Sequence, residues 1–536
     1  MSALSFYKTL FPFYLTRIRL IGLAVLFVLV SVGVSACGVF KPKPNVIIIL
    51  TDDMDMSLMP YLEQTNALIG QGGATFENYF VTSSLCCPSR ASILRGQYPH
   101  NTNVLSNNFP EGGFRRFFVD GDEAETLAVW LNREGYRTSL IGKYLNGYPV
   151  FAGSNYVPAG WTDWHALFYK KPSESGDYYN IYTLNENGPL VEYGDSAEHY
   201  STDVFRQKSL EFIDQSAEAG DPFFLFLSVY APHGPSVPAP RHADALEGLE
   251  YFQKPSFGEA DISDKPVVIQ EMANTGDEVD AGDANTLHLR RARTMLAVDE
   301  MVAALVEKLE QNGQLENTYI FFTSDNGFHI GEHQITAGKG LPYEEDIRVP
   351  LLVRGPGIAP GTVISQLTAN IDLAPTIAEM TGIDLPDFID GRSLVSLWGS
   401  EDSQPSEWRK GLLIEMGRMT LPASSTNGGL ALVNSLSLPF EFEYPDSARD
   451  VAALQTGDSA FRGIRAEDFV YVEYNNGEKE FYDLASDPYQ LENLAATLDP
   501  AILTSLRDWL AQLQTCTGGT CRELEDAMPN GLDKIQ

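Results

Sequence analysis

Short uninterrupted apolar runs recur along the chain and predict buried strands. Residues 45–51 read N-V-I-I-I-L-T, and residues 318–324 read T-Y-I-F-F-T-S. Short runs rich in β-branched and aromatic residues are typical of strands that are buried on both faces, as in parallel sheets. The segments at 136–141, 222–229 and 349–353 read as further strands.

Helical periodicity separates several of these runs. Residues 124–133 carry apolar side chains at helical spacing and end just before Gly135, and residues 295–309 form a second amphipathic pattern. Strands that alternate with helices predict an α/β fold, with a large, mostly parallel central sheet flanked by helices.

The pattern changes at about residue 410. Residues 468–474 alternate between apolar and polar, an N-N-G turn follows, and residues 480–484 continue as a second strand, which predicts a β-hairpin. Residues 500–513 predict an amphipathic helix. We therefore expect a main domain over residues 45–409 and a C-terminal subdomain over residues 410–536, with a small antiparallel sheet and a helix.

The first residues have the pattern of a bacterial export signal. Three cations (Lys8, Arg17 and Arg19) precede an uncharged apolar stretch, which ends in small residues directly before Cys37. We expect residues 1–36 to be a lipoprotein signal peptide, Cys37 to carry the lipid that anchors the chain to a membrane, and residues 37–44 to be a linker. The alternative is an uncleaved transmembrane anchor. Both place the remaining chain outside the cytoplasm, in the cell envelope, the periplasm or at the cell surface.

The net charge excludes one class of partner. The 536 residues contain 72 Asp+Glu against 37 Lys+Arg, a formal charge of −35. Electrostatic repulsion would oppose binding to nucleic acid, so no nucleic-acid partner is expected. This charge still allows a small local site for an anion.

Oxygen-bearing side chains follow two of the predicted strands, at 45–51 and 318–324. Asp52 and Asp53 come after the first run, and Asp325 and Asn326 after the second. Ligands bind at the carboxyl edge of parallel sheets, and carboxylate and amide oxygens are the donors that Ca²⁺ or Mg²⁺ prefers. Either pair alone could form a turn; together they predict a cation site.

Residues 86–96 read C-C-P-S-R-A-S-I-L-R-G and identify the chemistry. This segment resembles the signature of type I sulfatases, in which the first cysteine of Cys-x-Pro-Ser-Arg is oxidised to formylglycine by a separate enzyme. The match assigns that modification to Cys86. The resemblance extends over about residues 45–525 and is strongest toward N-acetylglucosamine-6-sulfatase-like bacterial sulfatases. Supporting strings are G-K-Y-L-N at 142–146 and S-D-N-G-F-H at 324–329.

The resemblance implies an alkaline-phosphatase-like sandwich, with residues 45–409 as the catalytic sulfatase domain. It implies hydrolysis of sulfuric esters on a sulfated carbohydrate, in particular the 6-O-sulfate of N-acetylglucosamine-type residues in a glycosaminoglycan or other sulfated glycan. The implied partners are this substrate and the formylglycine-generating enzyme. One hydroxyl of the aldehyde hydrate would attack sulfur, and the other would allow the aldehyde to reform with release of sulfate.

Individual roles are carried over onto matching positions. The implied metal ligands are Asp52, Asp53, residue 86, Asp325 and Asn326; the implied catalytic residues are Cys86, Arg90, Lys143, His233 and Lys339; and the implied substrate-binding residues are Asn146 and His329. Cys516 and Cys521 close a short loop in an exported protein, so we expect a disulfide between them.

Two other functions remain open at this point. A phosphatase or phosphonate monoester hydrolase of the same superfamily would share the metal ligands that follow the strands. A non-catalytic, surface-anchored glycan-binding protein could retain the fold, although the complete set of residues from Asp52 to Lys339 argues against it.

Overall fold

The computed structural model describes residues 42–169, 177–273, 279–398, 405, 407–417 and 460–532. The expected signal peptide and Cys37 lie outside these residues. The chain divides into two units, residues 1–43 and 44–536, and the second contains every element discussed below. No helix within the described ranges is both long and apolar enough to cross a bilayer.

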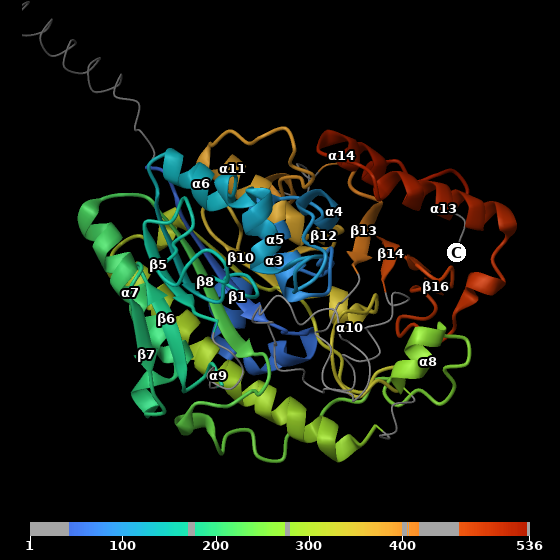
Figure 1. Ribbon diagram of the computed structural model, residues 1–536, viewed down its shortest axis with the longest axis horizontal. Helices are drawn as coiled ribbons and strands as arrows, with labels where there is room; N and C mark the ends of the chain where they lie inside the picture. Colours follow the sequence, from blue (N-terminus) through green and yellow to red (C-terminus); the bar gives the residue numbers. More distant parts are fainter. Residues whose placement is uncertain are drawn as a thin grey trace, which may run out of the picture. The chain divides into compact units, whose positions relative to one another are not determined.

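A ten-stranded sheet forms the centre of the second unit (Figure 1). Its strands are, in spatial order, β11 (Thr362–Ile364), β2 (Ala74–Phe76), β10 (Leu351–Arg354), β9 (Thr318–Ser324), β1 (Asn45–Asp52), β8 (Phe223–Pro232), β4 (Arg137–Gly142), β5 (Asp163–Leu167), β6 (Tyr182–Glu186) and β7 (Leu190–Tyr193). The five strands from β9 to β5 run parallel. Antiparallel pairs occur on both sides of them, at β10 and at β6–β7.

The packing of strand β1 explains why its residues 46–50 are all apolar. Val46, Ile48 and Leu50 belong to a hydrophobic cluster shared with helices α3 (Cys86–Arg95) and α11 (Leu373–Thr381). Ile47 and Ile49 belong to a second cluster, shared with α7 (Ser201–Ala219) and α9 (Ala281–Gln311). Alternate side chains of a strand point to opposite faces, so helices cover both faces of the sheet here.

The strands predicted from apolar runs are confirmed, with small shifts at their ends. The strand predicted at 349–353 is β10, which runs antiparallel to β9 and does not extend the parallel series. The helix predicted at 124–133 is α6 (Leu127–Arg133), because residues 122–124 form a separate 3₁₀ turn. The helix predicted at 295–309 is the C-terminal half of α9. The other α-helices in the part of the chain that the structure describes are α2 (Glu63–Thr65), α4 (Pro99–Thr102), α5 (Gly113–Asp120), α8 (Val267–Ala273), α10 (Glu344–Ile347), α13 (Pro500–Leu513) and α14 (Gly519–Asp526).

The C-terminal region forms its own antiparallel sheet. Its strands are β13 (Gly411–Met416), β14 (Phe461–Ala466), β15 (Phe469–Tyr474) and β16 (Lys479–Asp483). The predicted hairpin is the β15–β16 pair, the predicted helix is α13, and a disulfide joins Cys516 to Cys521. A two-stranded sheet pairs β3 (Tyr79–Phe80) with β12 (Thr368–Ala369).

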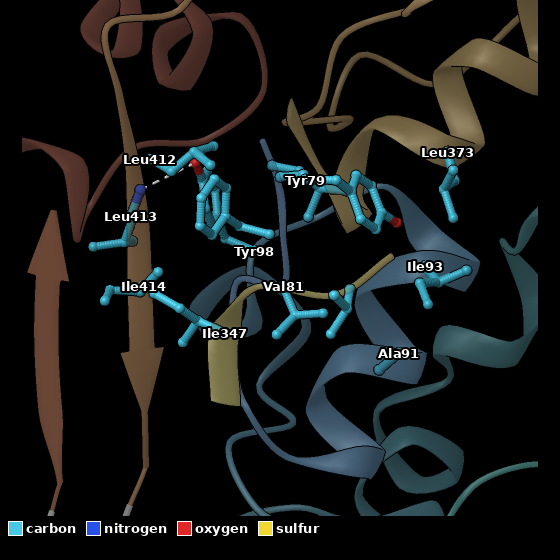
Figure 2. Packing of buried hydrophobic residues seen from close by; sticks show 14 of the residues in the cluster. Tyr79, Val81, Ala91, Ile93, Tyr98, Ile347, Leu373, Leu412, Leu413 and Ile414 are labelled. Carbon is cyan, nitrogen blue, oxygen red and sulfur yellow. Dashed lines mark hydrogen bonds between the residues drawn. The ribbon is translucent and has the colours of Figure 1, made fainter. Parts of the chain in front are cut away.

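The small sheet and the helix that carries Cys86 share one hydrophobic core (Figure 2). Leu412 and Ile414 of β13 belong to the same cluster as Tyr98 and as Ile93 of α3. Leu413 N donates to the Tyr98 hydroxyl oxygen at 3.4 Å. The C-terminal region therefore helps to support α3. The division at residues 409 and 410 remains a prediction.

Candidate active site

Four neighbouring parallel strands end beside one another and bring the predicted residues together. Asp52 and Asp53 lie at the end of β1, Lys143 follows β4, His233 follows β8, and Asp325 and Asn326 follow β9; Cys86 and Arg90 come from α3, and Lys339 from the loop between β9 and α10. Parallel strands expose their carboxyl ends at a single edge of the sheet, which is where ligands bind in such folds.

Cys86 is the first residue of α3 and is fully buried. Its Sγ lies 3.5 Å from Asp52 Oδ1 and 3.8 Å from Asp53 Oδ1, and Lys339 Nζ lies 2.9 Å from the sulfur. The N-terminus of a helix carries partial positive charge, which favours an anion or a polarised oxygen at this position. The side chain of residue 86 therefore lies among carboxylates, beside a lysine and a helix N-terminus.

Three buried carboxylates at this site each have a cationic partner. Lys143 Nζ lies 2.8 Å from Asp52 Oδ2, and Lys339 Nζ lies 2.6 Å from Asp53 Oδ1. Arg90 Nε lies 2.7 Å from Asp325 Oδ2, and its Nη2 lies 3.3 Å from Asp52 Oδ2. Buried charges are tolerated when they are paired in this way.

These contacts shift the pKa values of the acids in opposite directions. Burial alone would raise the pKa of Asp52, but Lys143 and Arg90 outweigh burial and hold it well below its usual range. Burial raises the pKa of Asp325 to about 6, and the nearby charge of Asp52 adds to this shift. Burial opposes the charge of Arg90, but Asp325 and Asp52 raise its pKa above the usual value.

The donor atoms suit a hard cation. Ligand atoms of Asp52, Asp53, Cys86 and His233 all lie within 4.8 Å of one another. Asn326 Nδ2 donates to Asp53 Oδ1 at 2.7 Å, while its buried Oδ1 has no hydrogen-bond partner among the described residues. A buried oxygen without a donor is costly unless a cation or water satisfies it. These oxygens fit Ca²⁺ or Mg²⁺ better than a softer metal.

The backbone at Asp53 is constrained to present its carboxylate. Asp53 has φ of 64°, in the left-handed region that non-glycine residues rarely adopt. Its N–H donates to Asp325 Oδ1 at 3.1 Å, and Met54 N donates to Ser324 Oγ at 2.9 Å, which ties the ends of β1 and β9 together. Such conformations concentrate at functional sites, because the surrounding structure has to enforce them.

His233 is held in one orientation. Its Nδ1 donates to the Gly234 carbonyl oxygen at 2.9 Å, so Nε2 faces Asp53 Oδ2 at 3.6 Å. The Tyr179 hydroxyl donates to the His233 carbonyl oxygen at 2.6 Å, which anchors the backbone at this position. The resemblance implies a catalytic role for His233, and the structure also brings it into the group of potential metal donors.

The two residues assigned to substrate binding lie on different loops, His329 after β9 and Asn146 after β4. His329 is buried, its Nδ1 lies 2.8 Å from Asp346 Oδ1, and its backbone pairs with Gly338, directly before Lys339. The Asn146 backbone oxygen accepts from Phe114 N at 2.7 Å, which connects the loop after β4 to the start of α5.

Three supporting residues were not predicted from the sequence. Ser228 Oγ accepts from Arg90 Nη1 at 2.6 Å, Asp346 holds His329, and Arg291 donates to the Asp53 carbonyl oxygen and lies 2.9 Å from Asp55 Oδ2. The sequence could have indicated Ser228, because its short polar side chain interrupts the apolar residues of a predicted strand. Nothing in the sequence relates Arg291, on α9, to the end of β1.

Known proteins are similar to this chain in sequence and in fold. The family model described as Sulfatase matches residues 44–383. The chain is 36% identical over 499 residues to the N-acetylglucosamine-6-sulfatase of Capra hircus, a match that covers 91% of this chain and 87% of that protein. A solved structure described as a complex with its substrate D-glucosamine-2-N,6-O-disulfate has a TM-score of 0.69 at 24% identity and covers 92% of this chain and 100% of its own.

A second solved structure bears on the alternative function. The phosphonate monoester hydrolase of Silicibacter pomeroyi has a TM-score of 0.66 at 21% identity and covers 89% of this chain and 96% of its own. The TM-scores of the two structures are close, so they confirm the predicted fold and do not separate the two activities. The family match and the 36% identity do separate them, because both are to sulfatases.

Proposed function

The chain belongs to the sulfatase family, and from this premise we propose that it removes a 6-O-sulfate from N-acetylglucosamine-type residues of a glycosaminoglycan or other sulfated glycan. The observation that carries the proposal is the contact of Lys339 Nζ with Cys86 Sγ at 2.9 Å. Lys143 pairs with Asp52, whose carboxylate lies next to this sulfur, and a ring nitrogen of His233 lies within 4.8 Å of it. The choice of sugar rests on the relatives, whose names specify N-acetylglucosamine-6-sulfate.

Cys86 is the residue proposed to become formylglycine. Its side chain lies beside Asp52, Asp53 and Lys339, as an oxygen nucleophile held by a cation would require. Once formed, the modified side chain supplies a hydrated aldehyde whose two hydroxyls allow attack on sulfur and later release of sulfate. Maturation would need a formylglycine-generating enzyme as a partner.

Asp52, Asp53, Asp325 and Asn326 are proposed to hold Ca²⁺ or Mg²⁺ together with residue 86. The bound cation would supply positive charge at the reacting oxygen. Arg90 bridges Asp52 and Asp325 and would keep both carboxylates ionised and fixed in place. Its bonds to Ser228 Oγ and to the Lys143 carbonyl oxygen link α3 to β8 and to the loop after β4.

The remaining residues would act on the substrate. Lys339 lies beside residue 86 and Lys143 pairs with the neighbouring Asp52. Both would hold sulfate oxygens as point charges while negative charge develops there. His233 Nε2 would donate a proton to the departing sugar oxygen, since a histidine can exchange protons near neutral pH. Asn146 and His329 would contact the sugar.

We also propose that the mature chain is an exported lipoprotein. The support is the pattern of residues 1–36 and the small residues before Cys37. Metabolic labelling with a fatty acid tests this directly: label should enter the wild-type chain and be absent from Cys37→Ala.

Two measurements test the proposed activity. Mass spectrometry of the peptide that contains residue 86 should show formylglycine in natively produced protein; finding only thiol in active enzyme would refute the nucleophile. The same preparation should hydrolyse an aryl sulfate faster than an aryl phosphate, and 6-O-sulfated faster than 4-O-sulfated N-acetylglucosamine. Faster phosphate turnover would favour the phosphonate hydrolase alternative.

A further inference from the structure

An arginine on α5 lies between two exposed aromatic rings. The guanidinium carbon of Arg115 is 3.9 Å from the ring centroid of Phe109 and 3.6 Å from that of Phe151. The two phenylalanines are 40% and 49% exposed, whereas large apolar side chains usually prefer the interior. Val119, one turn after Arg115 on the same helix, is 61% exposed. We call Phe109, Arg115 and Phe151 the arginine sandwich.

Arg115 forms no ion pair with any residue that the structure describes, in a chain that has 72 acidic and 37 basic side chains. The adjacent Arg116 shows the usual behaviour, with Nη2 2.9 Å from Asp120 Oδ2. Rings on both faces of a guanidinium leave its planar edge of N–H donors for binding, and this edge matches the two oxygens of a sulfate or carboxylate. The arginine sandwich is therefore suited to an oxyanion.

One of the two aromatic residues, Phe151, has a strained backbone conformation. Phe151 has φ of 75°, an outlier for a bulky residue, in the loop that follows Lys143. Backbone strain of this kind persists where the surrounding structure enforces it, and it is concentrated in ligand-binding segments. The strain is a second observation that points to binding, independent of the missing ion pair.

Short connections link the sandwich to the active site. Cys87 N donates to Asn107 Oδ1 at 2.9 Å, and Phe109 follows Asn107 by two residues, a reach of at most about 7 Å. Phe114 N donates to the Asn146 carbonyl oxygen at 2.7 Å, directly before Arg115. Short connections therefore tie the arginine sandwich to Cys87, next to residue 86, and to the loop that follows Lys143.

We propose that the arginine sandwich binds the sulfated glycan beyond the sugar whose ester is cleaved. The edge of Arg115 would hold a sulfate on a neighbouring sugar, and the exposed rings of Phe109 and Phe151 would pack against the C–H face of a pyranose. Because the body of the chain is strongly acidic, a local cation next to the site compensates for repulsion of a polyanion. This inference rests on the proposed function and defines the substrate further, as an oligosaccharide with more than one sulfate.

The test compares Arg115→Gln with the matched control Arg116→Gln on the same helix. Binding is measured by calorimetry at low salt with the full chain carrying Cys86→Ala, so the measurement does not depend on turnover. The probes are a heparin-derived tetrasaccharide, its desulfated form and 6-O-sulfated N-acetylglucosamine. We expect Arg115→Gln to weaken tetrasaccharide binding at least tenfold more than monosaccharide binding, and Phe151→Ala to weaken it in the same direction. The control should weaken neither.

The outcomes separate this proposal from the proposed function. If Arg115→Gln and Arg116→Gln weaken tetrasaccharide binding equally, or if desulfation leaves the effect of Arg115→Gln unchanged, the arginine sandwich does not recognise sulfate. If the wild-type enzyme fails to desulfate any of the probes but the Arg115 effect on binding persists, the proposed 6-O-sulfatase activity fails while the binding site stands.

Discussion

Glu123 offers a sharp test of the electrostatics around the loop that carries Lys143. It lies in the turn before α6, is 6% exposed, and accepts from Tyr156 OH at 2.6 Å and Tyr144 OH at 3.1 Å. Tyr144 directly follows Lys143. Burial raises the pKa of Glu123 from 4.5 to about 7, because the two tyrosine hydroxyls only partly replace the lost water.

The sign of the effect follows from linkage. Below pH 4.5 the carboxyl is protonated in both folded and unfolded chains and has no differential effect. Between pH 4.5 and about 7 the unfolded chain loses its proton first, so folding becomes less favourable as the pH rises. Above about pH 7 the destabilisation reaches its full size. For this pKa shift, the free energy of unfolding is lower by about 3 kcal/mol.

Glu123→Gln removes the ionisation and keeps the shape of the side chain. We expect the variant to match the wild-type free energy of unfolding at pH 4.5 and to exceed it by about 3 kcal/mol at pH 8. Urea denaturation of both chains at the two pH values measures the difference. Glu77→Gln removes an exposed carboxyl and is the control, which should shift neither value. Equal unfolding free energies for wild type and Glu123→Gln at pH 8 would refute a buried carboxylate with a raised pKa at this position.

Three further predictions concern the site and its support. Lys143→Ala and Lys339→Ala should each lower kcat about 100- to 1000-fold in steady-state assays on an aryl sulfate, because each removes a charge beside the reacting group; a change in KM alone would contradict this. Arg90→Lys should lower the free energy of unfolding by about 3 kcal/mol or more, since a point charge cannot bridge Asp52 and Asp325, and chemical denaturation would detect the loss. Replacing both Cys516 and Cys521 by serine should cost about 2 kcal/mol of stability for so short a loop, and an unchanged melting temperature would show that the disulfide adds nothing.

Much of the fold could be predicted because the apolar pattern depends on local geometry. A strand covered by helices on both faces places both sets of alternate side chains in apolar surroundings, so the apolar centres of N-V-I-I-I-L-T and T-Y-I-F-F-T-S indicated β1 and β9. Strand direction has no such signature. Residues 349–353 look like the other runs, yet β10 runs antiparallel, because its direction depends on where the preceding loop returns to the sheet.

The sequence by itself determined the chemistry of the site, and the tertiary structure decided its geometry. The motif around Cys86 and the oxygen-bearing pairs after β1 and β9 are each a short contiguous segment, so their residue types alone indicate a sulfatase with a cation site. Contacts that only the tertiary structure creates join residues far apart in sequence: Ser228 with Arg90, Arg291 with the Asp53 backbone, and Phe151 with Arg115. Only packing brings these partners within a few ångströms, because charge pairing and ring stacking depend on distance in space and leave no regular spacing in the chain.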